Sequence, residues 1–122
     1  MPRILLCSGE PILARGLESV FRHVKDFDLL PSCGSLAGLL DQMVSSKPEV
    51  LLLDLNPEVT FAVLSDLKQA APETSIVLWV TTISTELAFQ AMGLGIRGVL
   101  RKQLAAELQV KCLQKVHAGE LW

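Results

Sequence analysis

The chain has 122 residues, a formal net charge of −2 and 50% hydrophobic residues. A chain of this length can form one domain whose core needs no metal or disulfide to hold it together. The small negative charge gives no electrostatic footprint for nucleic acid, so any DNA binding is expected to come from another domain. The high apolar content favours strands that are buried on both faces.

The cysteine content and the length of the apolar runs indicate in which cellular compartment the protein is expected. Cys7, Cys33 and Cys112 are an odd number without a CxxC spacing, which favours a reducing compartment over a disulfide framework. The sequence has no secretory pattern and no apolar run of the roughly 18 residues that a membrane span needs. We therefore expect a cytoplasmic protein that makes no membrane contact.

The first half of the chain alternates strand and helix patterns. Residues 3–7 form a short apolar run, and residues 12–24 then carry apolar side chains at helical spacing. A second strand is expected at residues 27–30. Ser35 is expected to cap a helix that ends before Pro48.

The same alternation continues to the end of the chain. The remaining expected elements are strand 50–55, helix 59–71, strand 75–80, helix 85–92, strand 97–100 and helix 105–117. The last helix should pack on the sheet through one apolar face, formed by Leu108, Cys112, Leu113 and Val116.

Five strands that alternate with five helices predict a parallel sheet covered on both faces. Such folds place their sites in the loops at the carboxyl ends of the strands. In this chain those loops are residues 7–11, 54–58, 80–83 and 101–103.

Two charged residues of these loops suggest chemistry. Asp54 ends the most strand-like run of the chain, and an aspartate there can be a nucleophile toward phosphorus. It can equally be a turn residue that hydrogen-bonds local amides before Asn56 and Pro57. Lys102 follows the fifth strand, where it is either an ordinary surface lysine or a cation that neutralises Asp54.

Several short motifs resemble response-regulator receivers of the NarL/FixJ type. They are Arg-Ile-Leu-Leu at 3–6, Arg-Gly-Leu at 15–17, Leu-Leu-Asp-Leu at 52–55, Gly-Val-Leu-Arg-Lys at 98–102 and Val-His-Ala-Gly-Glu at 116–120. The resemblance implies a flavodoxin-like (βα)5 three-layer sandwich, an α/β fold with sheet order 2-1-3-4-5. It also implies that Asp54 is at the phospho-acceptor position and Lys102 at the partner-lysine position.

The resemblance also bears on domain organisation. It makes residues 1–122 a receiver (CheY-like) domain. The closing His-Ala-Gly-Glu segment leads, in this family, to a linker and a helix-turn-helix domain that binds DNA. We therefore expect the chain to be part of a transcription regulator whose C-terminal domain lies outside this sequence.

The chain departs from the family pattern at the metal site. Family members carry two adjacent acids after the first strand, which hold Mg²⁺, and here these positions are Ser8 and Gly9. Glu10 comes one position later and is otherwise a solvated acid near a helix start. A site made from Asp54, Glu10 and Asn56 is expected to bind Mg²⁺ weakly or not at all, because Mg²⁺ depends on carboxylate oxygens.

The switch residues of the family are also altered. Ungapped counting from Lys102 puts Val80 at the switch Ser/Thr position, with Thr81 adjacent to it, and Val99 at the position of the switch aromatic. The loop after Asp54 is shorter than in the family. Phosphoryl transfer needs cations to neutralise the developing charge, so we expect phosphorylation of Asp54 to be slow or absent.

A rival site involves two cysteines. Cys7 and Cys33 end strands one and two, which are neighbours in the implied sheet order, and they are either a redox pair or two small core residues. His23 and His117 lie far apart on predicted helices, where we expect both to be surface residues.

These observations favour a non-enzymatic, atypical receiver that acts in signal transduction through protein–protein contacts. The alternatives are a receiver in which Asp54 accepts phosphate, and a small flavodoxin-like redox or ligand-binding protein. Expected partners are a sensor histidine kinase or another regulatory protein. A homodimer is also expected, because Leu104, Leu121 and Trp122 leave apolar surface that a partner would cover.

Overall fold

The computed structural model describes residues 2–122 and contains one five-stranded parallel sheet. The strand order is β2-β1-β3-β4-β5, which confirms the expected flavodoxin-like topology. The strands are β1 (Arg3–Cys7), β2 (Asp28–Leu29), β3 (Val50–Asp54), β4 (Ser75–Val80) and β5 (Gly98–Arg101). Each lies where the sequence predicts it, and β2 is shorter than expected.

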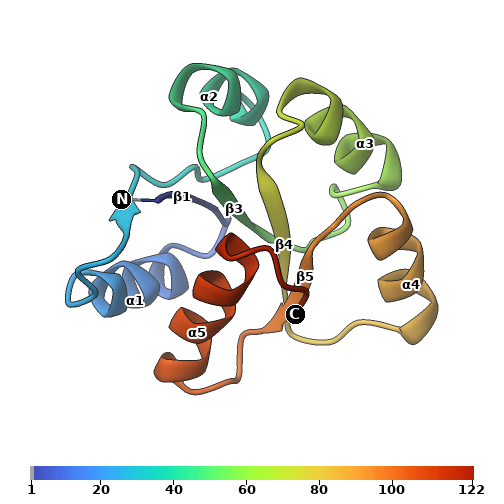
Figure 1. Ribbon diagram of the computed structural model, residues 1–122. Coiled ribbons are helices and arrows are strands. Elements are labelled where there is room, and N and C mark those ends of the chain that lie inside the picture. Colours follow the sequence, from blue (N-terminus) through green and yellow to red (C-terminus); the bar gives the residue numbers. More distant parts are fainter. Residues whose placement is uncertain (1) are drawn as a thin grey trace.

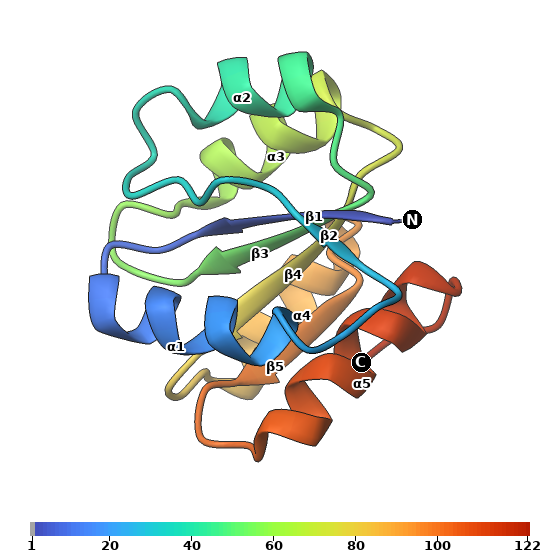
Figure 2. The ribbon, with the colours of Figure 1, turned by 90° about the vertical axis from the view of Figure 1, so that its left-hand side faces the viewer.

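Helices cover both faces of the sheet and complete three layers (Figures 1 and 2). Helices α1 (Pro11–Phe21) and α5 (Ala106–His117) share one apolar core with the sheet. Helices α2 (Leu39–Ser46), α3 (Phe61–Ala70) and α4 (Thr85–Gly93) share the other. None of the helices in residues 2–122 is long and apolar enough to cross a membrane.

The central strand β3 explains the unbroken apolar run of the sequence. All five of its residues are buried. Leu51 and Leu53 pack in the core under α2, α3 and α4, and Val50 and Leu52 pack in the core under α1 and α5. Because side chains alternate along a strand, Asp54 follows Leu52 onto the α1–α5 face at the carboxyl edge of the sheet.

Two helix details differ from the sequence-based expectation. Ser35 does not cap α2, which begins at Leu39 after Gly38. Gly38 has φ 79°, a left-handed conformation that glycine adopts without steric cost and that separates the preceding bend from the helix. In α5, Leu108 is 39% exposed, and the polar Gln109 is buried in its place. The true buried stripe therefore starts at Gln109.

The C-terminal tail folds back on the edge of the sheet. The Trp122 backbone N–H donates to the Arg97 carbonyl at 3.1 Å, and the indole packs on the α1–α5 core. A side chain at Gly98 would bring its Cβ within 3.0 Å of the Trp122 Cβ, so glycine permits this approach. The domain itself therefore covers part of Trp122, while Leu121 remains 59% exposed.

Candidate functional site

Three loop residues meet at the carboxyl edge of the sheet, on the face covered by α1 and α5. Ser8 follows β1, Asp54 ends β3 and Lys102 follows β5. Strand β1 pairs with β3 so that Cys7 lies opposite Leu53, which places Ser8 beside Asp54. The predicted meeting of Asp54 and Lys102 follows from the parallel register, because the carboxyl ends of all strands share one edge.

The Asp54 carboxylate is buried and has a partner on each oxygen. Its Oδ1 lies 2.6 Å from Lys102 Nζ, and its Oδ2 accepts a hydrogen bond of 2.7 Å from the Ser8 hydroxyl. The Asp54 side chain is only 6% exposed. The sequence marks Ser8 only as a position where the family has an acid. In the structure its hydroxyl stabilises the Asp54 carboxylate. The Ser8 hydroxyl also accepts from the Glu10 backbone N–H at 3.1 Å.

Glu10 also joins the site. Its Oε2 lies 2.6 Å from Lys102 Nζ, so two carboxylates hold one ammonium group. Glu10 is thus more than a solvated loop acid, although its side chain is 60% exposed. Burial alone would lower the pKa of Lys102, but hydrogen bonds and charges from Asp54 and Glu10 outweigh burial and raise it above its ordinary value. Lys102 therefore stays protonated.

A buried polar pair links this site to α5. Lys102 Nζ lies 5.6 Å from the centre of the Trp79 ring, a cation–π distance. The Trp79 indole N–H donates to Gln109 Oε1 at 3.0 Å. The Gln109 amide in turn donates to the carbonyls of Arg101 at 2.9 Å and Leu104 at 3.1 Å. One sequence signal could have indicated this role, namely a glutamine inside an apolar helix stripe.

Of the three candidate switch positions, Val80 and Val99 carry no hydroxyl, and Thr81 makes no side-chain hydrogen bond in the part of the chain that the structure describes. Val80 is buried in the core under α2, α3 and α4, on the opposite face from Trp79. Thr81 is exposed just after β4, and its carbonyl accepts from the Gln103 amide at 2.9 Å. Val99 is half-buried against the same core as Val80.

The side chains at this edge do not fit a magnesium site. Both oxygens of Asp54 have partners, and Glu10 is bound to Lys102. The Asn56 side-chain oxygen accepts from the Glu58 backbone N–H at 2.8 Å. Within residues 2–122, no cluster of three or more His, Cys, Asp or Glu side chains could hold a metal ion. An ammonium group at 2.6 Å from both carboxylates disfavours a divalent cation between them.

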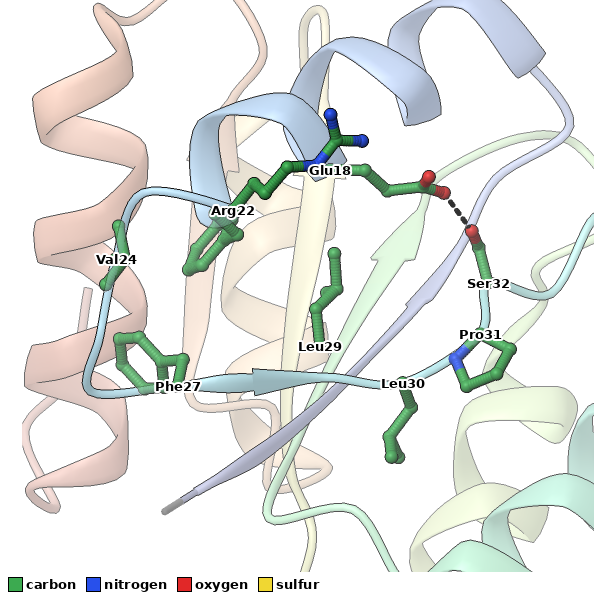
Figure 3. Close-up of a pocket in the computed structure, with 9 residues that line it drawn as sticks. Glu18, Arg22, Val24, Phe27, Leu29, Leu30, Pro31 and Ser32 are labelled. Carbon is green, nitrogen blue, oxygen red and sulfur yellow. Dashed lines mark hydrogen bonds between the residues drawn. The ribbon is translucent and has the colours of Figure 1, made fainter.

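The structure has a small cavity beside Asp54 and a larger cavity elsewhere. A cavity of about 90 Å³ is lined by Asp54, Cys7 and Asn56, among others. A larger one of about 540 Å³ lies between α1 and the segment that contains β2, where Glu18 accepts a hydrogen bond from Ser32 (Figure 3). The larger cavity shares no residue with the Asp54 site, so its size does not make it the functional centre.

The remaining candidate residues divide into one pair and two isolated histidines. Cys7 and Cys33 are neighbours, as expected, but Cys33 does not end β2: it lies beyond it and pairs with Cys7 as an isolated parallel bridge. Both side chains are also buried in the core. His23 and His117 are exposed on the surface, as expected.

Comparison with known proteins gives relatives of one kind. No protein-family model matches the chain. The chain is 22% identical over 121 residues to the transcriptional regulatory protein LnrK of Bacillus subtilis, an alignment that covers 98% of this chain and 55% of that protein. It is 20% identical over 123 residues to the oxygen regulatory protein NreC of Staphylococcus aureus, with 98% and 57% covered. The chain thus spans about half the length of the curated relatives it matches.

Solved structures agree on the fold. The receiver domain of RcsB from Salmonella enterica, determined with the phosphomimetic BeF3⁻, superposes with a TM-score of 0.87 at 17% identity and covers 99% of this chain and 91% of that one. The signal receiver domain of a NarL response regulator from Mycobacterium tuberculosis gives 0.88 at 20% identity, with 98% of both chains covered.

Proposed function

We propose that this chain, a response-regulator receiver domain by fold and by sequence similarity, signals through protein–protein contacts without normal phosphorylation of Asp54. In this proposal the domain belongs to a two-component system, and its output depends on a conformation that its own ion pairs hold. It acts as an interaction module and not as an enzyme.

The proposal rests on one observation: both oxygens of the Asp54 carboxylate have partners within the domain. Ser8 and Lys102 bind its two oxygens, and Glu10 forms a second ion pair with Lys102. Phosphoryl transfer to an aspartate needs a free oxygen and enough positive charge to neutralise the developing charge. Here an incoming phosphoryl group, with ~1.5 to 2 negative charges, would have to displace Glu10 from Lys102 and would meet its negative charge.

The proposal is tested by restoring the missing acids. The chain is incubated with a small phosphodonor and Mg²⁺, and its intact mass is measured over time. We expect the wild type to gain no phosphoryl group, and the double variant Ser8→Asp, Gly9→Asp to gain one that Asp54→Asn removes. Stoichiometric phosphorylation of the wild type at Asp54 would contradict the proposal and favour the alternative, a functional phospho-accepting receiver.

The proposed partners follow from the relatives. A sensor histidine kinase or another regulatory protein would contact the exposed loops around Asp54, whose neighbour Glu10 is largely exposed. DNA contact would come from a domain outside this chain, since the net charge of −2 provides no basic surface for it. One structural neighbour, RcsB, was solved bound to a promoter.

We also propose that the domain forms a homodimer through a helical face. Exposed apolar side chains offer two such faces, since Ile12 on α1 is 86% exposed and Phe89 on α4, on the other side of the sheet, is 75% exposed. A two-fold dimer is the commonest closed assembly. Sedimentation at tens of micromolar tests the idea, with Ile12→Glu and Phe89→Glu as variants. A wild type that sediments as a monomer with and without phosphodonor would refute it.

A further inference from the structure

A pair of cysteines lies beside the Asp54 site without being part of it. Cys7 ends β1, and Cys33 pairs with it as an isolated parallel bridge beyond β2. Neighbouring strands lie about 4.8 Å apart, which is within the roughly 4.4–6.8 Å between Cα atoms that a disulfide spans. Bridge partners on parallel strands direct their side chains to the same face, and both cysteines belong to the core under α2.

The two thiols share one acceptor. The Ser35 carbonyl oxygen accepts from the Cys33 thiol at 2.9 Å and from the Cys7 thiol at 3.5 Å. Both sulfur atoms therefore lie within 3.5 Å of one oxygen atom, whereas the third cysteine, Cys112, is buried in the other core of the domain.

The cysteine pair lies beside a small cavity. Cys7 borders the cavity of about 90 Å³ that also touches Asp54, and Ser35, whose carbonyl accepts from both thiols, borders the same cavity. A cavity needs only about 10–15 Å³ to hold a water molecule. This cavity thus admits a small oxidant such as hydrogen peroxide, while the buried sulfurs exclude large disulfide reagents.

We propose that Cys7 and Cys33 form a peroxide-sensitive dithiol that closes to a disulfide at the edge of the Asp54 site. Cys33 is the better attacking thiol, because it is 8% exposed against 3% for Cys7. Burial first, and then the neighbouring Cys33, raise the pKa of Cys7 to about 12, so Cys7 is a poor nucleophile for the first step.

The reaction balances with hydrogen peroxide as the only oxidant. The Cys33 sulfur attacks one peroxide oxygen, the O–O bond breaks, and Cys33 becomes a sulfenic acid as the first water leaves. The Cys7 sulfur then attacks the Cys33 sulfur, the S–S bond forms, and the S–O bond breaks. The leaving hydroxide takes the Cys7 proton as the second water. Two thiols are oxidised and one peroxide is reduced to two waters.

The bridge would act on the residue that holds Asp54. Ser8 directly follows Cys7, its backbone N–H donates to the Cys33 carbonyl at 2.9 Å, and its hydroxyl binds Asp54. Closing the disulfide would fix this segment and the start of the bend before α2. The dithiol therefore gives the domain an input that does not depend on whether Asp54 accepts a phosphoryl group.

The test uses the wild-type chain, with Cys112 as an internal control. The folded chain is exposed to hydrogen peroxide, denatured with an alkylating reagent and analysed by intact mass and by a tryptic map, which separates the three cysteines onto three peptides. We expect a loss of about 2 Da, one linked peptide pair that contains Cys7 and Cys33, and reversal by a reductant. Cys112 should stay alkylatable and react on the order of tenfold more slowly than the pair.

Two variants sharpen the result. Cys33→Ser should abolish the mass loss, and Cys112→Ser should keep it, with circular dichroism confirming that each variant is folded. The proposal is overturned if the wild type shows three free thiols after treatment, if Cys33 accumulates sulfinic acid without a bridge, or if Cys112 oxidises as fast as the pair. These outcomes are read from the wild type, so the test holds even if a variant does not fold.

Discussion

Replacing Lys102 by methionine removes the ammonium group that compensates Asp54 while it keeps the length of the side chain. The two charges lie 2.6 Å apart, and Asp54 is 5% exposed. With an effective dielectric constant of about 20, their Coulomb attraction is roughly 6 kcal/mol before desolvation is subtracted. Removing one partner of a buried ion pair costs about 3–5 kcal/mol, because the other charge stays in the protein uncompensated. We expect Lys102→Met to lower the free energy of unfolding by about that amount.

Urea denaturation at neutral pH measures this loss. With a slope of about 2 kcal/mol per molar urea, a loss of about 4 kcal/mol moves the midpoint down by roughly 2 M. The matched control is Lys111→Met, at an exposed lysine of α5, which should change stability by less than about 0.5 kcal/mol.

The double variant decides between a lost ion pair and a lost side chain. Asp54→Asn alone should cost little, because Lys102 keeps Glu10 as a partner. Asp54→Asn combined with Lys102→Met should recover most of the loss, because no buried charge remains. The reasoning is refuted if Lys102→Met costs less than about 1 kcal/mol, or if the double variant is as unstable as Lys102→Met alone.

Three further outcomes follow from the same structure. Calorimetry should give a Mg²⁺ dissociation constant above about 1 mM, since Lys102 holds both nearby carboxylates; a tighter site would contradict this. Burial raises the pKa of Cys112 from 9.0 to about 12, so stability should be complete below pH 9 and fall as pH rises toward 12. The loss reaches about 1.4 kcal/mol by pH 10, and Cys112→Ala should flatten this slope in unfolding measurements. Gln109→Leu should cost about 1–3 kcal/mol because the buried Trp79 indole N–H loses its partner and the Arg101 and Leu104 carbonyls each lose a hydrogen bond, whereas Gln114→Leu on the exposed face should cost little.

The strands could be predicted from the sequence because each is an apolar run between turn residues. In β3 and β4 nearly every side chain is buried, so composition alone indicated them. The helix boundaries were less predictable. Ser35 is a good capping residue, but the left-handed Gly38 places the helix start further along the chain. Local propensity therefore predicts that α2 exists but places its first turn too early in the chain.

The site was predictable in position and not in its hydrogen bonds. Strand ends bring Asp54 and Lys102 together in any sheet with this order. The roles of Ser8 and Glu10 depend on side-chain distances that a sequence alone does not show. For the same reason the sequence predicts Leu108 on the buried face of α5, whereas Gln109 occupies it and bonds the Trp79 indole N–H and two backbone carbonyls.

The most direct test of the closed Asp54 site is a backbone amide NMR titration with Mg²⁺ and beryllofluoride. Beryllofluoride mimics a phosphoryl group, and the structure of one neighbour was determined with it. Because Ser8 and Lys102 already occupy both Asp54 oxygens, we predict no saturable shifts at Gly9, Asn56 or Gln103 at millimolar concentrations. The restored variant Ser8→Asp, Gly9→Asp should show them. Saturable shifts of these amides in the wild type, lost in Asp54→Asn, would contradict the account.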